Sequence, residues 1–265
     1  MPPTLPRSRF SANFGTLFTE YPLPDRVAAA KACGFEVVEF QFPYDHSIEE
    51  LKAALDRSQV TLNNLNTPRG DISRDEWGHA GQPGREEDFR RYFGQAFEYA
   101  QALGAKVIHV MSGGCEPADL ARGEATYVSN LQWAAGEIAG SGITIVLEPL
   151  NAYDRPGNVV CKSDRIVELL GKIGEPSVKL MFDFYHIQVM EGDLIRRFRR
   201  HLPHIGHVQI ANAPLRTAPD VGEINFVAIF EELAQSDYAG PIGLEYKPKG
   251  RTEDDFGWME TFGIR

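Results

Sequence analysis

Four apolar runs in this 265-residue chain each end on one polar side chain of a type that binds hard metal ions. These side chains belong to Glu148, Asp183, Gln209 and Glu245. They are 35, 26 and 36 positions apart, and each interval has room for one strand, one helix and the next strand. The spacing therefore predicts consecutive parallel strands that carry the four residues at the same end. In an α/β barrel, that end is where active sites are built.

Strand-like and helix-like segments alternate along the rest of the chain as well. The predicted strands are 9–13, 35–42, 59–66, 105–111, 142–150, 177–184, 204–211 and 240–246. A helix is predicted after each of them, including 25–33, 47–55, one through Phe198, and 223–233. Eight strand–helix units predict a single-domain (β/α)₈ TIM barrel over residues 9–265, with residues 1–8 as an N-terminal tail.

Composition limits the partners and the compartment. The formal net charge of −10 argues against nucleic acid and anionic membranes as partners. No signal peptide and no apolar run near 18 residues is visible. The three cysteines, Cys33, Cys115 and Cys161, match neither a zinc motif nor a disulfide framework. We therefore expect a cytoplasmic protein, whose assembly into a homo-oligomer the sequence leaves open.

The four strand-end residues favour a divalent metal. Three carboxylates and one amide oxygen suit Mg²⁺ or Mn²⁺, with Co²⁺ as a further candidate. A salt bridge or a strand cap would explain any one of them, but the set of four favours a metal site. Glu148 and Glu245 would face each other across part of the barrel mouth, where they could act as a general acid–base pair. That arrangement suits isomerisation of an α-hydroxy carbonyl through an enediolate, or epimerisation beside a carbonyl.

Further residues are candidates for substrate binding. His186 follows Asp183 by three positions and could bind a substrate oxygen or orient a ligand. The alternative is a histidine satisfied at a helix start. Arg216 and Lys247 could pair with a substrate carboxylate, or could be solvated surface charges. Asn64, in the third predicted strand, is a weaker candidate.

The long connection 66–84, which carries Arg69, is predicted to form a lid over the site. Most other histidines, among them His79 and His207, are expected in loops or on the surface.

Several longer motifs carry a family resemblance. The most specific are Asp183-Phe184-Tyr185-His186-Ile187-Gln188, Gly206-His207-Val208-Gln209-Ile210-Ala211, Gly222-Glu223-Ile224-Asn225 and Glu245-Tyr246-Lys247-Pro248. With these motifs the chain resembles the hydroxypyruvate isomerase family of the xylose-isomerase-like barrel superfamily. The resemblance implies that Glu148, Asp183, Gln209 and Glu245 bind a divalent metal and that the two glutamates exchange the proton. It also implies conversion of hydroxypyruvate to 2-hydroxy-3-oxopropanoate (tartronate semialdehyde).

Alternatives stay open at this point. Relatives that isomerise 2-oxo-tetronate are hard to separate by sequence, and the chain departs from the family pattern at 67–69 and 72–79, in the expected lid. Ketose 3-epimerases usually carry histidine at the position of Gln209. A DNA-repair nuclease with several zinc ions would need more histidine ligands and a basic surface. A metal-binding protein without turnover is the remaining alternative.

Overall fold

Eight parallel strands close into a barrel in the computed structural model, which describes residues 5–265. The strands are β1 (Phe10–Asn13), β2 (Val37–Phe40), β3 (Thr61–Asn66), β4 (Val107–His109), β5 (Thr144–Leu147), β6 (Val178–Asp183), β7 (Ile205–Ile210) and β8 (Ile242–Leu244). Each strand pairs with the next in sequence, and β8 pairs with β1 through Ala12 and Leu244. The prediction of a (β/α)₈ barrel is therefore confirmed. Of the predicted tail, residues 1–4 lie outside the described part of the chain.

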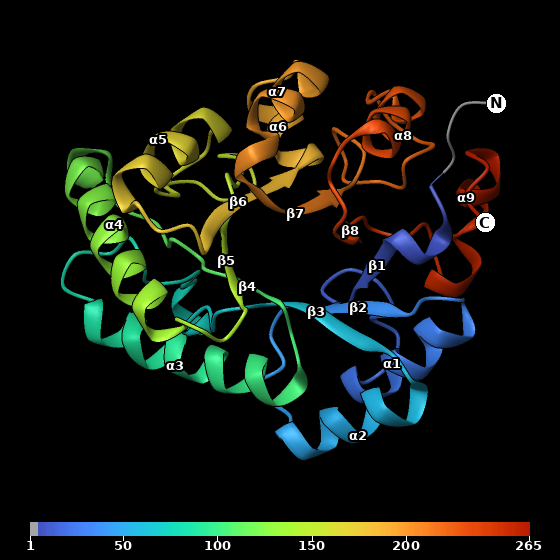
Figure 1. Cartoon of the computed structure of the whole chain (residues 1–265), viewed down its shortest axis with the longest axis horizontal. Coiled ribbons are helices and arrows are strands. Elements are labelled where there is room, and N and C mark those ends of the chain that lie inside the picture. The colour runs from blue at the N-terminus through green and yellow to red at the C-terminus, as the bar shows by residue number, and fades with distance from the viewer. Residues whose placement is uncertain (1–4) are drawn as a thin grey trace.

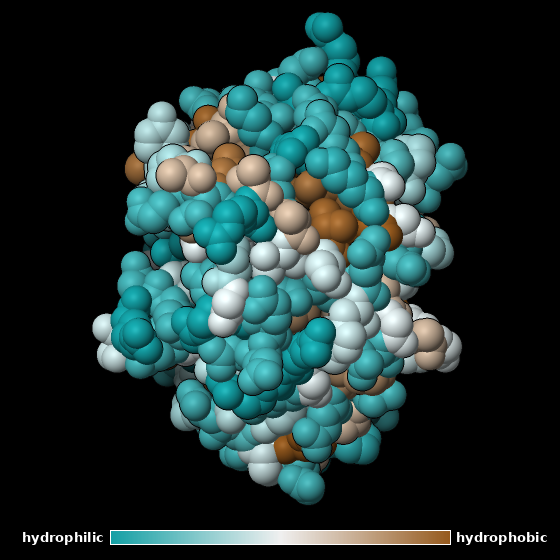
Figure 2. Space-filling view, turned by 90° about the vertical axis from the view of Figure 1, so that its left-hand side faces the viewer, coloured by the Kyte–Doolittle hydropathy of each residue, from teal (hydrophilic) through white to brown (hydrophobic). Residues whose placement is uncertain are grey.

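Helices form the outer layer around this barrel (Figure 1). They are α1 (Leu23–Ala32), α2 (Ile48–Ser58), α3 (Glu86–Leu103), α4 (Leu120–Glu137), α5 (Ser163–Ile173), α6 (Phe184–Met190), α7 (Leu194–His201), α8 (Phe226–Gln235) and α9 (Gly257–Thr261). Near the start of the described residues, the backbone N–H of Arg7 donates to the carbonyl of the last residue, Arg265, at 2.8 Å. Within residues 5–265, every helix is too short or too polar to cross a lipid bilayer. The face in Figure 2 is mostly hydrophilic, with apolar residues in small patches.

The helix that sequence predicts through Phe198 is in fact two helices, α6 and α7. Gly192 and Asp193 separate them with φ angles of 68° and 51°. Two consecutive left-handed residues cannot continue a right-handed helix, so the chain turns here. Other helix boundaries lie within a few residues of the prediction. Ser47 caps α2, since its hydroxyl accepts from the Glu50 N–H at 3.1 Å.

Side chains inside the barrel alternate with side chains that face the helices. Val107, Val146 and Met181 form a small apolar cluster that is separate from the main core. Because successive strand residues point to opposite sides, a residue two positions after one of these also faces inward. Glu148 and Asp183 therefore extend the inward rows of β5 and β6 at their carboxyl ends.

Aromatic packing fixes the strand end that carries Asp183. Phe182 and Phe184 flank this residue and have ring centroids 4.9 Å apart. Both also pack on Phe198 of α7, at 5.5 and 5.8 Å. All three rings are fully buried. The position of Asp183 thus depends on contacts outside the barrel as well as on the strand.

We predict that Phe198→Ala lowers the free energy of unfolding by about 3–5 kcal/mol, because it leaves a cavity among buried rings. Urea denaturation followed by circular dichroism measures the change. Val227→Ala is the control, since this side chain is 54% exposed on α8 and should shift stability by only about 0.5 kcal/mol. Equal effects of the two substitutions would contradict the proposed packing role.

Candidate active site

The four strand-end residues lie at the carboxyl ends of four consecutive strands. Glu148 directly follows β5, Asp183 is the last residue of β6, and Glu245 directly follows β8. Gln209 in β7 pairs in register with Asp183, and the Glu245 N–H donates to the carbonyl of Ile210 at 3.1 Å. Each of the four residues is less than a tenth exposed.

Several polar atoms of this group have no hydrogen-bond partner within the described residues, although they are buried. They are Glu148 Oε1, Asp183 Oδ2, Gln209 Oε1 and His186 Nε2. Ligand atoms of Glu148, Asp183 and His186 all lie within 4.8 Å of one another. Unpaired buried polar atoms are costly, and three oxygens of this kind suit a hard divalent cation. The residues present therefore fit a metal ion.

Glu39, in β2, lies directly beside the site and was not among the residues predicted from sequence. Gln209 donates through Nε2 to Glu39 Oε2 at 2.9 Å, so the oxygen of the same amide is left unpaired. Ser11, Asn13 and His207 also donate to this carboxylate, at 2.5, 3.1 and 2.8 Å. Glu39 is fully buried, so the network determines which way the Gln209 amide faces.

The ionisation state of Glu39 follows from the same contacts. Burial alone would raise the pKa of Glu39, but the charge of His207 and the hydrogen bonds from its neighbours hold that pKa below the usual value. The expectation of a loop or surface position is wrong for His207, which is buried in β7. His79 does lie in a loop, as expected, although its side chain is buried. An acidic residue within the apolar run of β2 was the available signal for this network.

His186 presents a hydrogen-bond donor to the carboxylates. Its Nδ1 accepts from the backbone N–H of Asn151 at 3.0 Å, so the neutral ring carries its proton on Nε2. Burial and the positive charge of Arg216 hold the pKa of His186 well below its usual value, so the ring is neutral at pH 7. Nε2 lies 3.6 Å from Glu148 Oε1 and 3.9 Å from Asp183 Oδ2.

A second histidine, His109 of β4, lies on the other side of Glu148. Its Nε2 is 3.6 Å from Glu148 Oε2. Burial and the charge of His207 lower the pKa of His109 to about 3. The ring is therefore neutral and can contact Glu148 without adding a positive charge.

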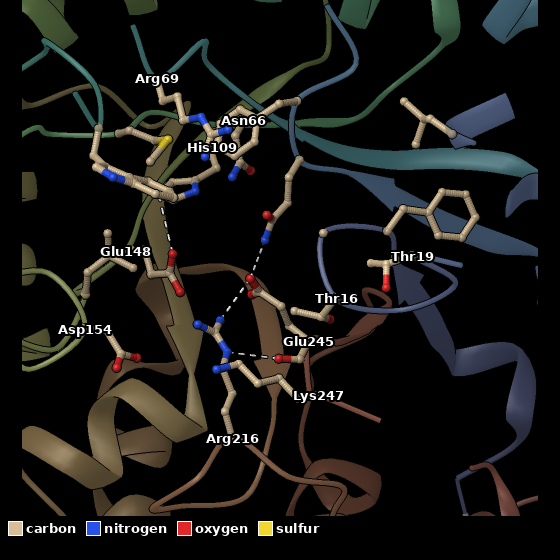
Figure 3. A pocket seen from close by; sticks show the side chains of 18 of the residues that line it. Thr16, Thr19, Asn66, Arg69, His109, Glu148, Asp154, Arg216, Glu245 and Lys247 are labelled. Atoms are coloured by element: carbon tan, nitrogen blue, oxygen red, sulfur yellow. Dashed lines mark hydrogen bonds and ion pairs between the residues drawn. The ribbon is translucent and has the colours of Figure 1, made fainter. Parts of the chain in front are cut away.

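Arg216 neutralises part of the acidic cluster. Its Nη2 lies 2.9 Å from Glu245 Oε1 and 3.8 Å from Asp183 Oδ2, and its Nε donates to the Glu245 carbonyl at 3.0 Å. Gln41, which the sequence analysis did not select, donates to Glu245 Oε1 at 2.5 Å. Figure 3 shows the Arg216 guanidinium directed at Glu245, with Glu148 nearby.

Burial raises the pKa values of the two glutamates toward neutral pH. It raises the pKa of Glu148 well above its usual value, and the charges of Glu245 and Asp183 add to the effect. Burial also raises the pKa of Glu245 to about 7, although Arg216 opposes the shift. Carboxyl groups with raised pKa values can exchange protons near neutral pH.

The carboxylates open into a cavity of about 820 Å³. The end of β3 supplies Asn66 to its wall, the connection after β3 supplies Arg69 and Trp77, and the connection after β5 supplies Asp154 and Arg155. Lys247 lies at the exposed rim, as expected for a cation near the mouth. Asn64, in contrast, is buried within β3 and is not part of the wall. Asn66, the next inward residue, lines the cavity instead.

The predicted lid, 66–84, is fastened to the start of α3. Glu76 accepts from the Asp71 N–H at 2.8 Å and contacts His79 Nε2 at 3.0 Å and Arg85 Nη1 at 3.1 Å. These contacts, led by the Asp71 backbone hydrogen bond, lower the pKa of Glu76 to about 2. Because this value lies below the usual 4.5, the ionised carboxylate stabilises the loop at neutral pH. That contribution is lost as the pH falls from about 4.5 toward 2.

Glu76→Gln should therefore loosen the loop without unfolding the barrel. We expect trypsin to cleave after Arg69 or Arg74 severalfold faster at neutral pH, with an unchanged urea midpoint, because local opening becomes easier. Mass spectrometry of the fragments measures the rate. Glu98→Gln, at an exposed site on α3, should cleave like the wild type. Unaltered cleavage of Glu76→Gln would show that this carboxylate does not hold the loop.

Comparison with known proteins establishes the family. Residues 27–262 match the family model described as xylose isomerase-like TIM barrel, and the chain belongs to this family. It is 42% identical over 255 residues to a 2-oxo-tetronate isomerase of Cupriavidus necator, covering 96% of this chain and 98% of that protein. It is also 42% identical over 258 residues to a hydroxypyruvate isomerase of Escherichia coli, covering 96% and 99%.

A solved structure extends the comparison to three dimensions. The crystal structure of a protein from Brucella melitensis, named as an AP endonuclease of family 2, superposes with a TM-score of 0.93. The sequence identity is 38%, and the alignment covers 97% of this chain and 99% of that one. The barrel described above is thus shared over nearly its whole length.

Proposed function

We propose that this protein is a metal-assisted isomerase that interconverts hydroxypyruvate and 2-hydroxy-3-oxopropanoate. The observation that carries the proposal is the group of buried, unpaired oxygens on Glu148, Asp183 and Gln209, beside two glutamates with raised pKa values. The two relatives at 42% identity, which are named for this reaction and for 2-oxo-tetronate isomerisation, support it.

Glu148, Asp183, Gln209 and Glu245 would hold the ion, for which oxygen ligands favour Mg²⁺ or Mn²⁺. Once bound, a divalent ion polarises the carbonyl and the adjacent hydroxyl of the substrate and makes the carbon-bound proton more acidic.

The three free cysteines support the prediction of a reducing compartment such as the cytoplasm.

The protein's own groups would move the protons. One of the two glutamates removes a proton from C3, the hydroxymethyl carbon of hydroxypyruvate, and an enediolate forms. The other glutamate delivers a proton to C2. The proton on the C3 oxygen passes to the C2 oxygen, so C3 becomes an aldehyde and C2 a secondary alcohol. His186, whose Nε2 carries a proton, donates a hydrogen bond to a substrate oxygen as negative charge develops there.

The activity itself is tested by proton NMR in D₂O. Hydroxypyruvate is incubated with metal-stripped protein before and after addition of Mg²⁺. We expect 2-hydroxy-3-oxopropanoate labelled with deuterium at C2, and only after the metal is added. No turnover by folded, metal-loaded protein would overturn the assignment to hydroxypyruvate, and 2-oxo-tetronate would be tested next.

The same sample tests the nuclease activity for which the Brucella protein is named. A duplex with one abasic site should stay intact, because a net charge of −10 repels the DNA backbone. Cleavage of that duplex would favour the nuclease alternative.

We predict that Glu148→Gln and Glu245→Gln each lower kcat at least about 100-fold, because each removes a proton-exchanging group. Steady-state kinetics measures the loss, and circular dichroism verifies the fold. Glu137→Gln, at the exposed end of α4, is the matched control and should retain full activity. Near-wild-type turnover in either active-site variant would refute the acid–base assignment.

Glu39→Gln should weaken metal binding while leaving the other ligands in place. A neutral amide cannot accept from Gln209 and from His207 as the carboxylate does, so the Gln209 oxygen loses its fixed direction. We expect about a 10–100-fold rise in the dissociation constant of Mn²⁺ by calorimetry, the range found when residues that orient metal ligands are changed. Glu36→Gln, on the exposed start of the same segment, should bind Mn²⁺ like the wild type. Equal Mn²⁺ affinities of Glu39→Gln and the wild type would rule out an orienting role for Glu39.

A further inference from the structure

Two arginines and one tryptophan form a distinct part of the cavity wall. Arg155 lies over the Trp77 ring with its guanidinium carbon 3.2 Å from the ring centroid. Arg69 lies 5.0 Å from the same centroid and 4.9 Å from that of Phe42. Stacking on an aromatic face holds a guanidinium in place and leaves the N–H groups at its edge free to donate.

Neither of these arginines forms a close ion pair. Over residues 5–265, the structure shows no carboxylate oxygen within 4.0 Å of a guanidinium nitrogen of Arg69 or Arg155, although Asp75 and Asp154 are charged neighbours of Arg155. Arg155 donates one hydrogen bond, to the Asp154 carbonyl at 3.0 Å. Burial lowers the pKa of Arg155, the charges of Asp75 and Asp154 oppose that shift, and the weaker effects of Arg216 and Arg69 add to it. An anion between the two arginines would relieve this repulsion.

The other cations of the cavity are less suited to bind an anion. Arg216 is already paired with Glu245 at 2.9 Å. Lys247 is exposed at the rim, where its charge is solvated. Figure 3 shows Arg69 across the cavity from both of these residues. Arg26 also lines the cavity, but its guanidinium already donates to the backbone carbonyls of Tyr21 and Phe14. Arg69 and Arg155 are thus the half-buried arginines of the wall whose N–H groups remain most available.

Backbone pairing holds the two arginine-bearing connections in fixed relation. Gly78 in the first connection bridges to Ser112 after β4, and Gly114 bridges to Asn158 in the connection that carries Arg155. The Ser112 hydroxyl also donates to Asn158 Oδ1 at 2.8 Å. The connection after β4 therefore ties the other two together, and the arginines are positioned before any ligand binds.

We propose that Arg69 and Arg155, stacked on Trp77, bind the carboxylate of the substrate and so select acidic hydroxy-carbonyl compounds over neutral sugars. The inference rests on the proposed function and adds the group that the site recognises. Arg69 lies across the cavity from Glu245 (Figure 3). A substrate carboxylate attracted to the two arginines therefore has its neighbouring hydroxy-carbonyl carbons directed at the glutamates.

The experiment compares two substrates that differ in one group. Dihydroxyacetone carries a hydroxymethyl group where hydroxypyruvate carries its carboxylate, and the isomerisation is otherwise the same. Arg69→Ala and Arg155→Ala should each lower kcat/KM for hydroxypyruvate about 10–100-fold, the effect of losing a charge-assisted hydrogen bond. Turnover of dihydroxyacetone should change less than about twofold. Arg74→Ala, exposed in the same connection, is the matched control and should leave both substrates unaffected.

Two kinetic outcomes overturn the proposal. Equal losses on both substrates would mean that the arginines maintain the shape of the site, and unchanged kcat/KM for hydroxypyruvate would mean that they do not contact it.

A binding measurement keeps the proposal separate from the proposed function. If the wild type does not turn over one of these substrates, calorimetry with D-glycerate and with glycerol replaces the kinetic comparison. Binding of glycerate that the Arg69→Ala/Arg155→Ala double variant loses would support the carboxylate site even without isomerase activity. The proposal would be overturned if the wild type and the double variant bound glycerate equally, or if the wild type did not bind glycerate.

Discussion

Three buried carboxylates meet at one end of the barrel, and their mutual repulsion governs the structure around them. Glu148, Asp183 and Glu245 come from three different strands, so the barrel itself holds the charges together. Arg216 compensates part of the charge, and the raised pKa values of the two glutamates reflect what remains. A divalent cation would remove the rest. The same repulsion that costs folding energy would therefore favour the binding of a cation, and it keeps the pKa values of the two glutamates raised.

The neighbouring polar groups are arranged to present one kind of atom to that site. Glu39 takes the donor side of the Gln209 amide, and the Asn151 N–H occupies Nδ1 of His186. As a result, Gln209 offers an oxygen and His186 offers an N–H. Neither of these supporting groups needs to touch the substrate. Their contribution is to fix an orientation that the side chains alone would leave open.

Much of this arrangement could be predicted from sequence, for a physical reason. The alternation of apolar strands with helices repeats at a regular spacing, so Glu148, Asp183, Gln209 and Glu245 could be assigned to equivalent strand ends. Glu39 and Gln41 were missed because a single polar residue in an apolar run does not reveal its partners, which lie more than 160 positions away in β7 and beyond β8. The break between α6 and α7 was missed because Asp193 adopts a left-handed conformation that its residue type does not require. Arg155 could not be selected, since its role depends on stacking against a loop that is distant in sequence.

The bridges from Gly78 to Ser112 and from Gly114 to Asn158 join three consecutive connections into one continuous strip of backbone. A change of length in any one of them would displace the other two. New substrate preferences in this barrel would therefore have to arise by side-chain replacement on an unchanged strip, or by simultaneous remodelling of all three connections. Grafting a single loop from a relative would transfer its residues without transferring their positions.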